Sequence, residues 1–380
     1  MMSEKKVPAI RFRGFEDDWE QRKLSDLVDV CSGMDYKHLS IGNIPVFGTG
    51  GYMLSVDKAL SYDRDAIGIG RKGTIDKPYI LKAPFWTVDT LFYCIPRDEG
   101  TLNFDYDLFQ CIDWKQKDES TGVPSLSKVA INDTDVIVPK TEEQKKIGYF
   151  FEELDLVITL HQCKLEKLKI VKKSMLVNCF PKNGEKVPKF RFSGFTGDWE
   201  QRKVGEVIED YVEKTTVQNQ YPVLTSSQQQ GIVLQEDYFA DRQVTTNDNV
   251  GYYVLPRGYF TYRSRSDTDL FVFNRNNLID KGIISYYYPV FRPKNADSNF
   301  LLRRLNKGIR SQVSMAAEGT GQHVLAHSKL KSMEFLVPSV PEQKLIGAYF
   351  EILDHLITLH QSELEKLQKI KKSLLERMFV

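Results

Sequence analysis

The sequence lacks the features that mark secreted and membrane proteins. Its first ten residues, MMSEKKVPAI, contain no apolar run, so we expect no secretory leader and a cytoplasmic location. The longest apolar stretch lies near IISYYYPVF and has about half the length that a membrane span requires. We therefore expect no membrane association.

Cysteine is sparse and unpatterned. The five cysteines form no C-x-x-C pair and have no histidine at ligand spacing; they are Cys31, Cys94, Cys111, Cys163 and Cys179. This pattern excludes a disulfide framework and a zinc site, so we predict free thiols in a reducing compartment and no metal.

A strong charge of one sign is also missing, and so are the common catalytic motifs. The net charge is only +1, so any DNA binding would have to depend on local patches or on partner proteins. No G-x-x-x-x-G-K-[ST], H-E-x-x-H, G-x-S-x-G or N-P-P-[FY] motif occurs. The sequence therefore indicates none of the corresponding catalytic sites.

An internal repeat organises the chain. VPAIRFRGFEDDWEQRKL at residues 7–24 returns as VPKFRFSGFTGDWEQRKV at residues 187–204, and a helical block that begins at Val138 returns at Val337. Each half thus has a leading motif, a body and a closing helix. The two bodies, 25–137 and 205–336, show no obvious similarity beyond scattered residues. The duplicated motifs and helices with unlike bodies predict a symmetric scaffold that carries two different recognition domains. The alternative is a tandem duplication whose bodies diverged under weak constraint.

The closing segments have the pattern of long helices. Thr141-Glu142-Glu143-Gln144 fits a capping box, and Pro341 stands where a first-turn proline is tolerated. Seam positions then follow at alternating steps of four and three residues, which predicts that the two helices pair with each other. The predicted seam consists of Leu154, Ile158, Leu165 and Leu168 with Leu353, Ile357, Leu364 and Leu367.

Polar residues also lie on or beside this seam. Lys172 and Lys371 interrupt it in the two copies. His161 and His360 are expected to be packed, hydrogen-bonded residues more often than ligands. The lysines of the first helix are expected to form a solvated face rather than a row of DNA contacts.

The stretch GIGRKGT at residues 68–74 contains a formal G-x-G-x-x-G. A dinucleotide loop would open a helix after Gly73, but Pro78 stops a helix there. We therefore predict a strand, a turn and a strand, with Arg71 and Lys72 presented at the tip. Backbone amides and two cations would suit a phosphate or a guanine edge. A plain turn with solvated charges is the alternative.

Further candidate residues come from the ends of the bodies and from one strand-like segment. ESTGVPSLSKV and EGTGQHVLAHS precede the closing helices at matching places. YFTYRSRSDTDLF interleaves tyrosine with arginine, which suits contacts to phosphates and bases. Its alternative is an edge strand protected by charge.

These residues together resemble the specificity subunit of type I restriction-modification systems. The resemblance rests on the paired GF.DWEQRK motifs, IGRKGT, GTGQ and the P..EQK helices, and it covers nearly the whole chain. It implies an α+β fold: two mixed, strand-rich target-recognition domains joined by two long antiparallel helices that form a coiled coil, in a pseudo-two-fold repeat. We place the first domain at 1–140, the central helix at 141–180, the second domain at 181–338 and the C-terminal helix at 339–380.

The resemblance implies a non-catalytic subunit that reads a bipartite, gapped target in double-stranded DNA. Two modification subunits and restriction subunits are the expected partners. S-adenosylmethionine, ATP and Mg²⁺ are expected in those partners, with no cofactor bound by this chain. The residues expected to contact DNA are Arg71, Lys72, Thr74, Thr121 and Ser125 in the first body, and Tyr262, Arg263, Arg265, Thr320, Gln322 and His323 in the second.

The charges of the bodies qualify this prediction. Residues 24–137 hold 11 Lys and Arg against 17 Asp and Glu, a net charge of −6. Such a domain repels phosphate, so we expect tight DNA binding only with partners that supply cations. The competing hypotheses are a coiled-coil scaffold for proteins, without DNA specificity, and a nucleotide-binding enzyme that uses the Gly68–Gly73 loop.

Overall fold

The computed structural model describes residues 7–182, 184–239, 248–267, 270–317 and 323–380. The chain divides into two compact units, and neither is a simple half of the sequence. Unit 1 comprises Met1–Lys164 and His360–Val380, and unit 2 comprises Leu165–Leu359. The two long helices are therefore shared between the units, whereas the sequence had suggested that they were separate segments.

Unit 1 is built on antiparallel strands covered by short helices. A four-stranded sheet has the order β2-β8-β5-β6, and a three-stranded sheet has the order β4-β3-β7. The strands of these sheets are β2 (Val28–Ser32), β3 (Ile41–Gly48), β4 (Gly51–Val56), β5 (Ala66–Gly70), β6 (Tyr79–Leu81), β7 (Trp86–Thr87) and β8 (Leu91–Pro96). The helices of this body are α1 (Leu102–Cys111) and α2 (Lys128–Asn132), with single 3-10 turns at Leu24–Asp26 and Trp114–Lys117. All five residues of β5 are buried, which explains its run of small and apolar side chains.

Unit 2 repeats this topology although its body sequence is unlike. Its four-stranded sheet has the order β11-β19-β15-β17. In both four-stranded sheets, the strands that come first, last, second and third along the chain lie side by side in that order. These strands are β11 (Ile208–Asp210), β15 (Phe260–Tyr262), β17 (Phe273–Arg275) and β19 (Val290–Pro293). The two-stranded pairs are β12 (Leu224–Ser227) with β13 (Gly231–Leu234), β14 (Tyr253–Pro256) with β18 (Lys281–Ile284), and β16 (Arg265–Ser266) with β20 (His323–Val324). The short helices are α4 (Val204–Val207), α5 (Gln235–Tyr238), α6 (Ser298–Gly308), α7 (Arg310–Ala316) and α8 (His327–Ser332).

The leading motif closes each unit in the same way. Its EQRK segment forms β1 (Glu20–Lys23) in unit 1 and β10 (Glu200–Lys203) in unit 2. Each pairs antiparallel with the strand just before the Val-Pro that starts the long helix, β9 (Asp135–Val138) or β21 (Glu334–Val337). The buried tryptophans Trp19 and Trp199 precede these strands. The duplicated sequence is thus the part of each unit that joins its body to its long helix.

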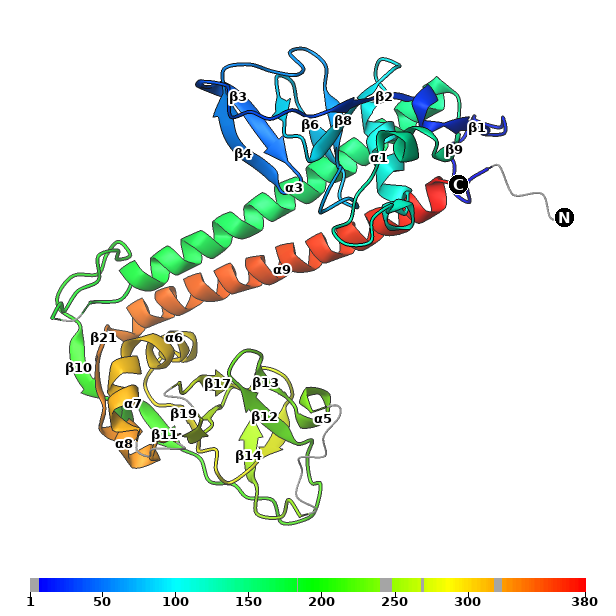
Figure 1. Ribbon diagram of the computed structural model, residues 1–380. Coiled ribbons are helices and arrows are strands. Elements are labelled where there is room, and N and C mark those ends of the chain that lie inside the picture. Colours follow the sequence, from blue (N-terminus) through cyan, green and yellow to red (C-terminus); the bar gives the residue numbers. More distant parts are fainter. Residues whose placement is uncertain (1–6, 183, 240–247, 268–269, 318–322) are drawn as a thin grey trace. The chain divides into compact units, whose positions relative to one another are not determined.

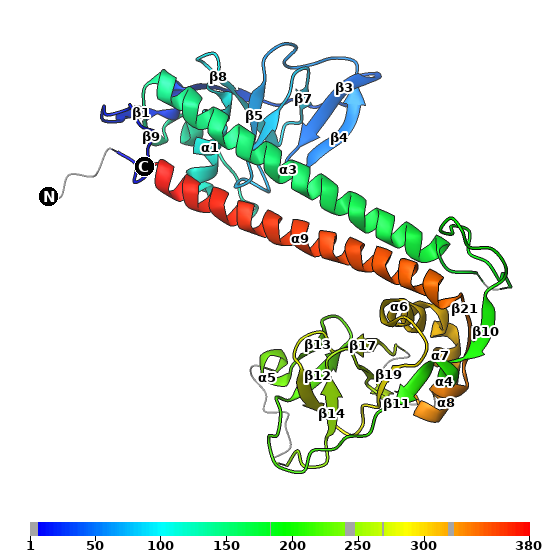
Figure 2. The same ribbon diagram turned by 180° about the vertical axis from the view of Figure 1, so that it is seen from behind.

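The long helices are α3 (Thr141–Asn178) and α9 (Val340–Met378), close to the predicted ranges. They run side by side in opposite directions (Figures 1 and 2). In unit 1, Leu154 of α3 packs in the same core as Leu374 of α9, and in unit 2 Leu168 packs in the same core as Leu353. Ile158, Leu165, Leu168 and Leu353 are buried, and Leu154, Ile357, Leu364 and Leu367 are half-buried. The two long antiparallel helices are confirmed, and the predicted seam residues lie buried or half-buried along them.

The capping box predicted at Thr141 is not formed. Glu143 instead accepts two hydrogen bonds from Arg11, at 2.7 and 2.8 Å, and the side chain of Gln144 donates to the carbonyl of Pro139. Thr141 is already the first residue of α3, so the side-chain amide of Gln144 donates to the carbonyl of Pro139 and not to a capping residue.

Candidate nucleic-acid interface

The glycine loop connects two strands. β5 and β6 pair antiparallel, with Ala66 opposite Leu81, and no helix follows Gly73. The strand–turn–strand prediction is confirmed, and the dinucleotide-binding alternative lacks the helix whose amino end would receive the phosphates. The fold of the loop itself explains why glycine stands at residues 70 and 73. A Cβ on Gly70 would lie 2.0 Å from the carbonyl oxygen of Thr74, and Gly73 has a φ of +91°, which favours glycine.

The backbone amides of this loop are already used. The N–H groups of Arg71 and Lys72 both donate to the carbonyl of Thr90, and that of Gly73 donates to Pro124 at 2.8 Å. The predicted contribution of these amides to an anion cradle is therefore wrong. The side chains of Arg71 and Lys72 remain exposed, whereas Thr74 is half-buried. The arginine reaches the carbonyl of Asp89 only at 3.4 Å.

A second predicted segment lies against this loop. Lys72 and Ser125 form an antiparallel bridge, and the N–H of Leu126 donates to the carbonyl of Arg71 at 3.0 Å. Thr121 is exposed beside them in the sequence. The structure therefore brings the two predicted segments of the first body into one surface.

Asp118 shapes that surface and was not identified from the sequence. Its carboxylate accepts from the N–H groups of Ser125 and Ser120, both at 2.9 Å. These two hydrogen bonds, first that of Ser125, lower the pKa of Asp118. An aspartate four residues before a Gly-Val-Pro turn is a signal for such a turn, but a weak one.

The second body has the same arrangement. β16 pairs with β20, so that Arg265 lies opposite Val324, and the N–H of Leu325 donates to the carbonyl of Ser264 at 2.9 Å. This bond is the counterpart of the bond from Leu126 to Arg71 in the first body. Each donor is a buried leucine that precedes its long helix by the same number of residues. By this correspondence Arg265 occupies the position of Lys72.

Three predicted residues of the second body do not form part of this described surface. Tyr262 is fully buried, and its hydroxyl donates to the carbonyl of Leu325 at 3.2 Å, so it stabilises the domain core and cannot contact DNA. By the same correspondence it stands at the position of Ile69, another buried residue. Thr320 and Gln322 lie outside the described residues. His323 is half-buried on β20.

Arg265 lies over an aromatic ring that was not singled out from the sequence. Its guanidinium carbon is 4.5 Å from the ring centroid of Tyr287, and Tyr286 and Tyr287 are 55% and 43% exposed. The run of three tyrosines from residue 286 was a visible signal for this surface, since exposed aromatic side chains mark binding sites.

A polar hollow adjoins the same segment. It has a volume of about 520 Å³ and is lined by Arg263 together with Ser227, Gln229 and Gln235 among others. Arg263 is exposed and forms no hydrogen bond or ion pair with any residue in the described ranges. The glutamine-rich stretch TSSQQQ supplies much of the lining, and sequence reasoning had not used it.

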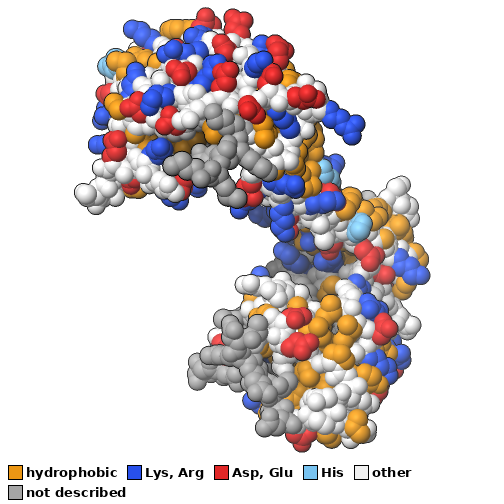
Figure 3. Space-filling model, turned by 90° about the vertical axis from the view of Figure 1, so that its right-hand side faces the viewer, with side chains coloured by type: hydrophobic (Ala, Val, Ile, Leu, Met, Phe, Trp, Pro, Cys, Tyr) orange, Lys and Arg blue, Asp and Glu red, His pale blue; other side chains and the backbone are white. Residues whose placement is uncertain are grey.

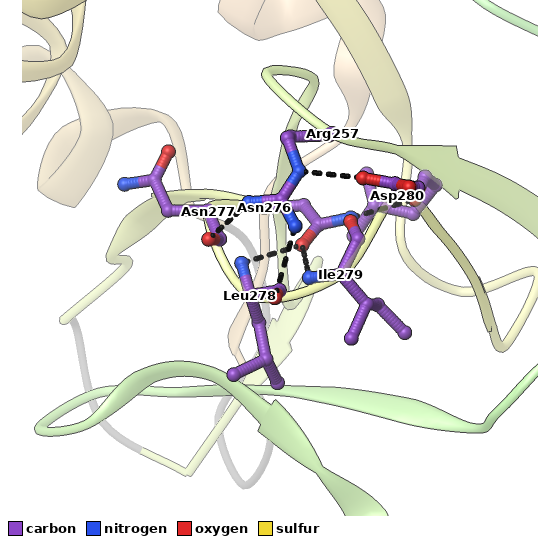
Figure 4. Close-up of polar contacts among 7 residues, drawn as sticks. Arg257, Asn276, Asn277, Leu278, Ile279 and Asp280 are labelled. Carbon is purple, nitrogen blue, oxygen red and sulfur yellow. Dashed lines mark hydrogen bonds and ion pairs between the residues drawn. The ribbon is translucent and has the colours of Figure 1, made fainter.

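Not every exposed arginine of this domain is available to a ligand. Arg257 pairs with Asp280 at 2.9 Å and donates to the carbonyls of Asn277 and Leu278, while buried Asn276 accepts from the backbone of the same turn (Figure 4). Arg257 therefore holds the turn between β17 and β18.

Comparison with known proteins identifies the family. The model of the type I restriction modification DNA specificity domain matches twice, at residues 16–169 and 196–369, and so covers both copies of the repeat. The chain belongs to this family. Specificity subunits of type I systems are non-catalytic DNA-recognition subunits, as the sequence resemblance implied, and the catalytic activities lie in partner subunits.

Individual relatives are distant. The type I restriction enzyme MjaVIII specificity subunit of Methanocaldococcus jannaschii is 23% identical over 81% of this chain and 74% of its own length. The S subunit of a type I restriction-modification system from M. genitalium has 13% sequence identity and a TM-score of 0.65 over 98% of this chain and 99% of its own. This structural similarity supports the fold of the specificity subunits, two domains and a long helix pair.

Among the described residues, no group of three or more His, Cys, Asp or Glu side chains is arranged to hold a metal ion. None of the helices in the described ranges combines the length and apolar character needed to span a membrane.

Proposed function

We propose that this specificity subunit reads a bipartite, gapped sequence in double-stranded DNA, with one half-site for the globular body of each unit. One observation carries the proposal. In both bodies a cation-bearing segment follows the second strand of a sheet of the same topology and pairs with the segment before the long helix. Two segments that recognise different half-sites should occupy equivalent positions in their domains but carry different side chains, as these two segments do.

The proposed contacts in the first body are Arg71, Lys72, Thr74, Thr121 and Ser125. Those in the second body are Arg263, Arg265 and His323, and Thr320 and Gln322 remain predicted contacts outside the described residues. The net charge of the first body and its mixed surface support a model in which this chain recognises the sequence while other subunits attract the phosphates. Lys and Arg side chains alternate with Asp and Glu on the face of unit 1 shown in Figure 3. We infer that partner subunits supply much of the attraction to phosphate.

The helix pair is proposed to set the gap between the half-sites. At a rise of about 1.5 Å per residue, α3 and α9, with 38 and 39 residues, are each long enough to measure more than one turn of DNA.

The outer side of α3 supports docking of partner subunits. Tyr149, Leu156, Ile170 and Val177 follow a seven-residue spacing on the side away from the seam, and each is at least half exposed. Exposed apolar side chains in a regular row mark a protein-binding surface. We propose two modification subunits and the restriction subunits as partners, with S-adenosylmethionine, ATP and Mg²⁺ bound in those partners, in the cytoplasm.

The first experiment is methylation mapping. The chain is co-expressed with the modification subunit of its own source, and methyladenine is mapped across the host genome. The proposal predicts a split motif with a fixed gap that disappears when this chain is omitted. A soluble complex that produces no new methylation would contradict DNA recognition and favour the scaffold hypothesis.

A further inference from the structure

The guanidinium of Arg265 is held over an exposed ring and has no hydrogen-bond or ion-pair partner among the described residues. Its central carbon lies 4.5 Å from the ring centroid of Tyr287. Arg265 is exposed and makes no hydrogen bond or ion pair with any residue that the structure describes. All of its N–H donors are therefore open to a ligand, while the stack restricts the orientation of the group.

Tyr287 is itself fixed on the body of unit 2. The hydroxyl of Ser264, the residue before Arg265, donates to the carbonyl of Tyr287 at 2.5 Å. On its other side Tyr286 packs with a ring-centroid distance of 4.3 Å, and the hydroxyl of Tyr286 donates to that of Tyr287 at 3.3 Å. The hydrogen bond from Ser264 thus ties the backbone of Tyr287 to the residue next to Arg265.

The chemistry of this arrangement differs from that of a phosphate contact. A phosphate needs a positive charge, which a flexible lysine supplies as well. A planar fork with fixed orientation matches two acceptors at a set spacing, and the O6 and N7 atoms of guanine present such a pair in the major groove. The first body carries a lysine, Lys72, at the corresponding position, with no comparable ring contact found among the described residues.

We propose that Arg265 reads one guanine of the second half-site through a bidentate hydrogen bond, and that Tyr287 is the positioning residue that orients it. This inference rests on the proposed function and names one base within it. Lys72, at the matching position of the first body, contributes charge without selecting guanine.

The test compares conservative and truncating variants in the co-expressed modification complex, with methylation mapping and rates on duplexes that differ at single positions. The wild-type complex is expected to require a G·C pair at one position of the second half-site. Arg265→Lys keeps the charge but loses the fork, so discrimination at that position should fall by roughly 10- to 100-fold, with the first half-site and the gap unchanged. Arg265→Ala should relax the same position.

The role of Tyr287 is tested with a separate pair of variants. Tyr287→Phe retains the ring and should leave the motif unchanged, whereas Tyr287→Ala should weaken the preference at the same position as Arg265→Lys. Arg310→Ala is the matched control, because Arg310 is an exposed arginine of the same domain that begins α7 and is not part of the β16–β20 pair. Thermal unfolding of each variant complex shows whether the fold is intact.

The outcomes distinguish guanine recognition by Arg265 from the proposed recognition of a bipartite target. A uniform loss of methylation in Arg265→Ala, rescued by Arg265→Lys with the motif unchanged, would overturn base reading and leave a phosphate contact. A wild-type motif without an essential G·C pair in the second half-site would also overturn it. Absence of any split motif from the wild-type complex would instead contradict the proposed function itself.

Discussion

Arg11 and Arg191 occupy the same place in the two copies of the leading motif. Each forms two hydrogen bonds with a buried glutamate in the first turn of a long helix, Glu143 or Glu342, at 2.7–2.8 Å. The glutamate side chains are only 2% and 1% exposed. These contacts explain why the short motif and the distant helix block are duplicated together, because each needs the other to satisfy its charge.

Replacing Arg11 with alanine should destabilise unit 1 by about 2–3 kcal/mol, since it leaves a buried carboxylate without its donors. Urea unfolding of the purified chain measures the change. Lys140→Ala is the control, because Lys140 pairs with Asp17 on the surface and its loss should have no measurable effect. Equal stability of the two variants would contradict this account of the leading motif.

A buried carboxyl makes unit 1 sensitive to pH. Burial raises the pKa of Asp105 to about 7, against about 3.9 in an unfolded chain. The folded state therefore holds a proton that the unfolded state releases, so stability should decrease as the pH rises from about 4 to 7 and then level off.

Asp105→Asn should reduce the difference in urea midpoint between pH 5 and pH 8. It should not abolish the difference, because burial also raises the pKa of Asp107. The hydroxyl of Thr101, which donates to Asp105 at 2.9 Å, can still find an acceptor in asparagine. An undiminished pH dependence would show that the carboxyl of Asp105 is not the group responsible.

At the scale of elements, the sequence predicted the helices better than their polar contacts. Lys172 and Lys371 appeared to interrupt the seam, but Lys172 pairs with Asp354 at 2.5 Å and Lys371 with Asp155 at 2.7 Å, in each case across the helix pair. A seven-residue pattern identifies which residues face a partner helix. It does not show which acidic residue of that helix lies opposite, because this depends on the alignment of the two helices.

The histidines occupy the middle of this pattern. The Nδ1 atoms of His161 and His360 are 3.3 Å apart, as expected for packed, hydrogen-bonded residues. They are equivalent positions of the repeat and contact each other, so an insertion beside each histidine changes both helices at the same place.

Insertion of one heptad into each helix beside these histidines should lengthen the gap of the DNA target without changing either half-site. The added length is about 10.5 Å, which corresponds to about three base pairs at 3.4 Å each. Methylation mapping of the variant complex gives the gap directly. A substitution of the same segment without a change in length is the control, and an unchanged gap after insertion would contradict the proposed role of the helices.

At the scale of the molecule, the repeat and the long helices followed from periodicity and duplication in the sequence, whereas the fold class followed from the family resemblance. The common topology of the two bodies did not follow, since strand order depends on contacts between distant segments. Tyr262 illustrates the limit at a single residue. The interleaving of tyrosine with arginine suggested a tyrosine presented to DNA, but all three residues of this strand are buried, and only the packing decides that.

The isolated chain should bind duplex DNA weakly at ~150 mM salt, where the Debye length is about 8 Å. The net charge of −6 on residues 24–137 supplies no general attraction to phosphate. Fluorescence anisotropy with a duplex that carries the mapped motif measures this binding, with the complete modification complex as the comparison. Nanomolar affinity of the chain alone would show that partners are not needed for charge.

The division into units also affects the order in which the protein can fold during synthesis. Unit 2 is one continuous stretch, Leu165–Leu359, whereas the core of unit 1 includes Met378 and Phe379 from the end of α9. At ~5–20 residues per second, the ribosome makes these two residues about 10–40 s after it completes the first part of unit 1. The N-terminal domain is thus begun first and finished last. Until then the apolar surface that Met378 and Phe379 cover stays exposed in the nascent chain.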